Sequence, residues 1–187
     1  SIQPFNGSNY NNLVTINAPG TTKIRGIEAD LTVNPIDGLT LNASYAYTYT
    51  KIPPVLITAT AGATSSSVYQ NFYIVFTPRN AASGAIDYRV PVPGATLKLH
   101  LDANYAQSTQ AFDQFATHND ASFLVNGRVS LADIELGSGQ KLNVAFWGRN
   151  LFDKRYFVGY GAANAVSPYI GVLGDPRTYG VTGKVSF

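Results

Sequence analysis

Apolar and polar residues alternate with a period of two along most of this chain, and that alternation restricts the fold more than any other feature. In the clearest stretch, residues 39–50, one set of alternate positions holds Leu39, Leu41, Ala43, Tyr45, Tyr47 and Tyr49. The other set holds Thr, Asn, Ser and Ala. Successive side chains of a β-strand point to opposite faces, so the pattern predicts a strand with one apolar and one polar face.

The same pattern recurs and predicts seven antiparallel strands in an all-β fold. The predicted strands cover residues 22–34, 39–50, 82–90, 96–106, 121–132, 141–150 and 178–187. Residues 13–17, which precede Ala-Pro-Gly, could form an eighth strand or the upper half of one long bent strand. Short turns are predicted at 35–38, 91–94 and 135–140, and long connections at 52–79, 108–120 and 153–176. Short turns at one end and long loops at the other are typical of an up-and-down transmembrane β-barrel.

Seven alternating strands also suit a soluble β-sandwich, in which a second sheet covers the apolar face. Three features favour lipid instead. Tyrosines cluster at one end of a strand, as at a membrane boundary, and the apolar faces lack the Lys, Glu and Pro that protect open sheet edges. Thr, Ser and Asn dominate the opposite face. Charged residues make up only 13% of the chain, about half the usual share of a soluble domain.

Membrane helices and enzyme chemistry find little support in the sequence. No apolar run reaches the roughly 18 residues that a spanning helix needs, whereas a spanning strand needs only about 9–11. The chain has no Cys, and His100 and His118 lie on separate predicted elements, so we expect no catalytic, metal or cofactor site. The formal net charge of +2 gives no reason to expect nucleic acid as a partner.

Motifs near the end of the chain resemble a known family. Residues 150–156 read NLFDKRY and residues 174–181 read GDPRTYGV, and the chain stops at Phe187 after an alternating strand. Upstream, residues 25–28 and the Tyr-rich strand that follows add to the likeness. Together these segments resemble the C-terminal barrel portion of TonB-dependent outer-membrane receptors. The residues that carry the family motif are Asn150, Leu151, Phe152, Asp153, Pro176 and Arg177. The terminal strand resembles a membrane-insertion signal through Tyr179, Val181, Val185 and Phe187.

The resemblance implies a 22-stranded barrel, of which residues 1–187 would form the C-terminal part, so we expect the chain to be a fragment. It implies a receptor, not an enzyme, which imports a scarce ligand such as a ferric siderophore, cobalamin or a glycan. The implied partners are outer-membrane lipid, the barrel-assembly machinery, the ligand, and TonB through an N-terminal region that this sequence lacks. The C-terminus would then be periplasmic. The alternatives are a small passive barrel or porin, and a soluble β-sandwich that binds a ligand.

Aromatic residues in the long connections are the candidates for ligand contact, because they supply stacking area on exposed loops. The candidates are Tyr69, Phe72, Tyr73, Phe112, Phe115, Tyr160 and Tyr169. Packing of each loop on itself would explain them equally well. Charged residues on the polar face are expected chiefly to pair with one another or to be hydrated.

Overall fold

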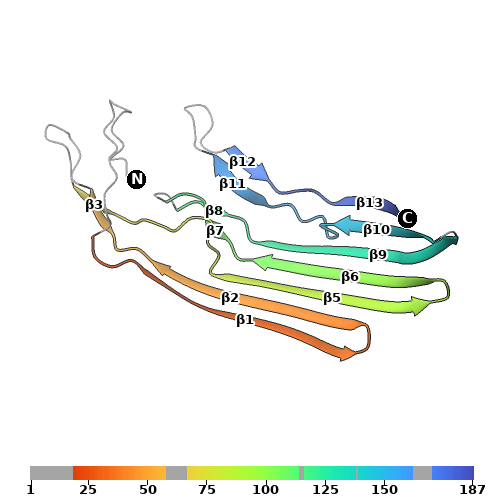
Figure 1. Ribbon diagram of the computed structural model, residues 1–187. Helices are drawn as coiled ribbons and strands as arrows, with labels where there is room; N and C mark the ends of the chain where they lie inside the picture. The colour runs from red at the N-terminus through yellow and green to blue at the C-terminus, as the bar shows by residue number, and fades with distance from the viewer. Residues whose placement is uncertain (1–18, 58–66, 114–115, 138, 162–169) are drawn as a thin grey trace.

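Seven long β-strands form one curved layer in the computed structural model, which describes residues 19–57, 67–113, 116–137, 139–161 and 170–187 (Figure 1). The long strands are β1 (Lys23–Ile36), β2 (Leu39–Lys51), β5 (Asn80–Val92), β6 (Ala95–Ala106), β9 (Ser122–Gly137), β10 (Gln140–Arg149) and β13 (Thr178–Ser186). They run antiparallel, and each pairs with the next long strand along the chain. Within the described residues, no helix is long and apolar enough to cross a membrane.

The predicted all-β, up-and-down arrangement of seven strands is confirmed, with most strand ends within two or three residues of the expected positions. The strands contain between 9 and 16 residues. The possible eighth strand at 13–17 lies outside the described residues. The alternation is therefore sufficient to predict the long strands, because a half-exposed strand needs one consistent set of side chains on each face.

Short turns join the strands at one end of the layer, at the right of Figure 1. Gly38 lies in the turn between β1 and β2 with a φ of 79°, and a side chain there would collide with the carbonyl oxygen of Arg89. The turn after β9 is shorter than predicted, since β9 continues to Gly137, which pairs with Gln140. Asp133, with a φ of 59°, accompanies a shift of register that lets the strand continue.

The long connections at the other end contain strands that the sequence analysis did not predict. Each connection contains a small two-stranded sheet. These sheets pair β3 (Val55–Ile57) with β4 (Val68–Gln70), β7 (Thr109–Gln110) with β8 (His118–Asn119), and β11 (Phe157–Gly161) with β12 (Ile170–Leu173). Such strands are too short to show a periodic pattern in the sequence.

One face of the layer, the apolar face, carries large apolar side chains on all seven strands. In one row, Leu41 lies opposite Ile86, which in turn lies opposite Leu101. Many of these side chains are exposed, including Val181 at 71% and Phe146 at 56%. No second layer of described polypeptide covers them, so the β-sandwich alternative is set aside. The expectation that this face lacks lysine is wrong at the loop end, where Lys23 lies opposite Lys51.

The opposite face, the polar face, carries a network of side-chain hydrogen bonds. The His100 ring lies between two carboxylates, 2.8 Å from Asp87 and 3.3 Å from Asp102. Asp102 also accepts hydrogen bonds from the amides of Asn104 and Asn126, each at 2.8 Å. Cross-strand pairing of polar residues therefore occurs as expected, because the antiparallel register brings polar positions of neighbouring strands together.

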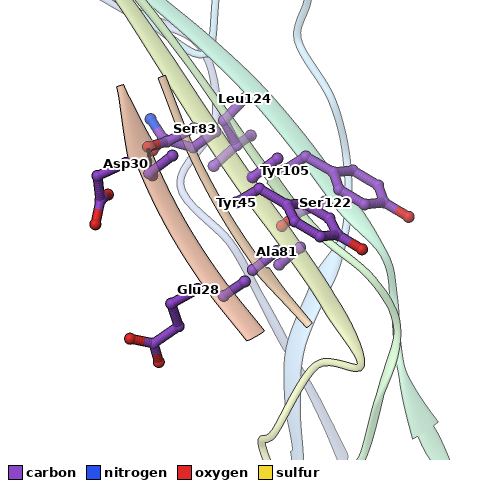
Figure 2. Close-up of a pocket in the computed structure, with 13 residues that line it drawn as sticks. Glu28, Asp30, Tyr45, Ala81, Ser83, Tyr105, Ser122 and Leu124 are labelled. Carbon is purple, nitrogen blue, oxygen red and sulfur yellow. Dashed lines mark hydrogen bonds between the residues drawn. The ribbon is translucent and has the colours of Figure 1, made fainter. Parts of the chain in front are cut away.

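A shallow hollow lies against β1, β2, β5, β6 and β9, where small side chains such as Ser44, Ala46 and Ser83 leave space. Figure 2 illustrates the two faces, with Glu28 and Asp30 pointing to one side of the sheet and Tyr45 and Tyr105 to the other. The separation follows from the register, since Asp30 lies opposite Ser44 and the neighbouring position Tyr45 lies opposite Ala29.

Candidate ligand site at the loop end

A second hollow, of about 420 Å³, lies where the connections around β4 and β7 meet the ends of β2 and β5. The first and second long connections both contribute residues to it. Among the residues that line it are Asn71, Phe72, Tyr73, Thr109, Gln110 and His118. The hollow thus combines two aromatic rings with amide, hydroxyl and imidazole groups, which is the composition expected of a small-molecule site.

Backbone hydrogen bonds hold the first two connections together around this hollow. The N–H of Tyr73 donates to the carbonyl of Asp113 at 2.8 Å, and that of Phe76 donates to Gln110 at 3.0 Å. Val75 and Gln110 also form an isolated parallel β-bridge. The segment after β4 therefore runs beside β7, and the two connections form one wall.

The third connection is linked to the second through Asp120 and Phe157. The N–H of Phe157 donates to the Asp120 carboxylate at 2.9 Å, and the N–H of Asp120 donates back to the Phe157 carbonyl at 3.3 Å. All three connections are thereby joined at the loop end of the sheet.

The structure brings together only some of the predicted ligand contacts. Phe72 and Tyr73 line the loop-end hollow. Tyr69 lies on β4 and is 75% exposed, while the Tyr160 ring on β11 packs 5.4 Å from that of Phe157. Phe112 is half-buried and directly precedes Asp113, whose carbonyl accepts the hydrogen bond that joins the first two connections. Phe115 and Tyr169 fall outside the described residues.

His118 also lines the hollow and is exposed, and the sequence analysis did not name it as a ligand contact. Its Nε2 atom lies 2.9 Å from the side-chain nitrogen of Gln110. An amide nitrogen can only donate, so in this arrangement His118 Nε2 is the acceptor. The carbonyl oxygen of the same Gln110 side chain is buried without a hydrogen-bond partner among the described residues. No sequence signal marks this pair, because strand pairing of β7 with β8 creates it.

The predicted family motif forms a compact junction beyond the end of β10. Asn150 is buried and adopts a φ of 48°, which Asn tolerates better than most residues. Its amide nitrogen donates to the carbonyls of Lys154 at 2.9 Å and Asp175 at 3.0 Å, and its oxygen accepts from the N–H of Lys154 at 2.8 Å. The N–H of Asn150 in turn donates to Asn126 at 3.0 Å.

The second half of the motif meets the first at this junction. Asp153 accepts a long hydrogen bond of 3.4 Å from the N–H of Arg177, and the ring of Tyr156 packs against Gly174. Leu151 is half-buried and Phe152 is 71% exposed. The two motif segments are thus parts of one structural element that fixes the entry into β13.

A single curved antiparallel sheet with an exposed apolar face, a polar opposite face and loops gathered at one end is the wall of a membrane β-barrel. Comparison with known proteins supports this assignment to a β-barrel wall. The family described as TonB dependent receptor-like, beta-barrel, matches residues 1–151. The chain belongs to this family of TonB-dependent receptors.

Two relatives extend the comparison. The ferric-pyoverdine M114 receptor PbuA of Pseudomonas sp. (strain M114) is 32% identical over 174 residues, which are 90% of this chain and 19% of that protein. The crystal structure of BauA, the ferric preacinetobactin receptor of Acinetobacter baumannii, has a TM-score of 0.61 at 20% identity and covers 88% of this chain and 22% of that one. The chain thus spans about a fifth of each relative, and the second likeness concerns the fold alone.

Proposed function

We propose that the chain forms part of the wall and loop end of an outer-membrane receptor that imports a ferric siderophore with energy delivered through TonB. Membership of the receptor family supports the general class. The choice of a ferric siderophore, over cobalamin or a glycan, draws on the relative described as a ferric-pyoverdine receptor.

The observation that carries the proposal is the loop-end hollow built by two connections. A siderophore complex is a bulky chelate with flat and amide-bearing surfaces. Phe72 and Tyr73 would supply stacking area, and Asn71, Gln110 and His118 would supply hydrogen bonds. The joined connections would hold these groups in place before the ligand arrives, which reduces the entropy lost on binding.

The polar face would line the interior of the barrel. Its hydrogen-bonded rows, including Ser44 with Ser83 at 2.6 Å, would present a hydrated wall to a plug domain and to the moving ligand. The described sheet would then be one sector of a larger barrel, and TonB would act on a part of the protein outside it.

The same proposal implies an orientation of the sheet in the outer membrane. The loops would face outward and the short turns would face the periplasm. Ser186 pairs with Lys141 beside the turn that joins β9 to β10, so the C-terminus would also lie on the periplasmic side. Tyr179, Val181, Val185 and Phe187 lie exposed along the terminal segment and would serve as the signal read by the assembly machinery.

The test uses the full-length protein in cells that lack other ferric-pyoverdine receptors, with ⁵⁵Fe-labelled ferric pyoverdine as the probe. The double variant Phe72→Ala/Tyr73→Ala is expected to weaken binding about tenfold, since each aromatic contact contributes about 0.5–1.5 kcal/mol. Tyr69→Ala, outside the hollow, is the matched control and should change binding little. Equal losses in both variants would contradict the site.

A separate measurement distinguishes active import from passive diffusion. Deletion of TonB should abolish accumulation of the label while leaving surface binding unchanged. Continued accumulation without TonB would support the passive barrel and overturn the proposed mechanism. Absence of ferric pyoverdine binding by the unaltered protein would overturn that choice of ligand.

A further inference from the structure

The apolar face ends, at the loop side of β1, β2 and β5, in a cluster of cations and tyrosines that we call the basic rim. The basic rim consists of Lys23, Arg25, Tyr47, Tyr49, Lys51 and Arg79. The register puts Arg25 opposite Tyr49 and Lys23 opposite Lys51. The guanidinium carbon of Arg79 lies 5.9 Å from the ring centre of Tyr47 and 5.5 Å from that of Tyr49. All four cations are exposed, and Lys51 and Arg79 also border the loop-end hollow.

The basic rim has no negative counterpart on its own face. The register assigns no Asp or Glu to the apolar face of the seven strands, and the nearby Glu28 and Asp30 point to the other side (Figure 2). Among the described residues, none of the four cations forms an ion pair. The side-chain ion pairs that do form, such as Lys98 with Asp133 at 3.9 Å, lie on the polar face.

The same face is different at the other end of the strands. Towards the short turns it carries Leu39, Tyr88, Val90, Leu97 and Leu142, with no cation among them. The loop end of β13 repeats the cation–tyrosine arrangement, with Arg177 lying 5.8 Å from the ring centre of Tyr179. Positive charge on this face is therefore confined to the loop end.

We propose that the basic rim binds the phosphate groups of anionic lipid in the leaflet on the loop side. Lipid covers the apolar face in the barrel, and tyrosine rings mark the boundary between hydrocarbon and headgroups. A cation held over such a ring lies in the headgroup layer, where phosphate is the available anion. Arginine presents paired N–H groups that fit phosphate, and lysine adds a mobile charge on an apolar stem.

The test measures lipid preference with the full-length protein in neutral detergent. Phosphatidylglycerol and phosphatidylcholine with the same acyl chains are offered together, and retained lipids are counted by native mass spectrometry. The protein should retain phosphatidylglycerol about fivefold or more over phosphatidylcholine at low salt, because one cation near a membrane surface contributes about that factor. The triple variant Lys23→Gln/Arg25→Gln/Arg79→Gln should lose this preference.

The matched control removes three cations from the polar face through Arg89→Gln/Lys141→Gln/Lys184→Gln, and it should keep the preference. A conservative variant, Arg25→Lys/Arg79→Lys, retains charge and fold and should keep part of it. Preference that survives in the triple variant, or that is equally lost in the polar-face control, would overturn the proposal. So would displacement of the lipid by millimolar inorganic phosphate, which would indicate a site for the free anion.

Discussion

The two faces of this sheet share one backbone, yet their side chains interact with their surroundings in opposite ways. On the polar face, His100, Asp102 and their neighbours satisfy one another through hydrogen bonds across strands. On the apolar face, residues such as Leu99 and Val129 lie side by side and remain partly exposed. The backbone hydrogen bonds between the strands are the same for both faces. The medium that touches each face decides which substitutions the protein tolerates.

The sharpest way to break the comparison is to place a charge in the middle of the apolar face. Leu99→Arg should destabilise the full-length protein by about 2–4 kcal/mol, since a cation near the bilayer midplane loses its hydration. The measurement is denaturant unfolding in lipid vesicles. A cost below about 1 kcal/mol would mean that hydrocarbon does not cover this side chain.

Asn150 provides a third environment, buried between strand ends and exposed to neither medium. Asn150→Ala should cost about 1–3 kcal/mol, because it leaves the backbone groups of Lys154 and Asp175 without their partner. The same unfolding measurement applies. Asn34→Ala, which removes the acceptor of a hydrogen bond from the Thr40 hydroxyl, is the control and should change stability by no more than about 0.5 kcal/mol.

Removal of a carboxylate from the polar face should have a smaller effect. Asp102→Ala is expected to cost about 0.5–1.5 kcal/mol, since water can replace it as the acceptor for Asn104 and Asn126. Unfolding in the same vesicles gives the value. A loss as large as that of Leu99→Arg would indicate that the polar face is dry rather than hydrated.

The smallest change in stability is expected from a substitution at Lys98. Lys98 neighbours Leu99 on β6 but faces the other way, and its contact with Asp133 is a long 3.9 Å between two exposed side chains. Lys98→Ala should therefore change stability by about 0–1 kcal/mol. Equal costs at positions 98 and 99 would show that the faces are assigned wrongly.

The sequence predicts the long strands well because their signals are local. Alternation identifies β5, expected at 82–90 and observed at Asn80–Val92, and Gly38 with its neighbours marks a tight turn. The small sheets in the connections escape prediction because strands of two to five residues, such as Thr109–Gln110, have no measurable period.

Contacts that depend on distant pairing are also beyond the reach of the sequence. The bond from Tyr73 to Asp113 joins two connections whose relative position only the sheet determines. Arg79 stacks over Tyr47 and Tyr49 because β5 pairs with β2. Aromatic residues in the loops can be named as candidates from the sequence, but which of them share a hollow cannot.

The order of the sheet has a final consequence for how it must be completed. Among the described residues, β1 and β13 are its outermost strands, and each pairs with a long strand on one side only. The opposite margin of each presents backbone N–H and C=O groups that hydrocarbon cannot hydrate, at a cost of several kcal/mol per group. Both margins therefore require neighbouring strands before the wall can remain in lipid, so insertion and closure of the ring depend on each other.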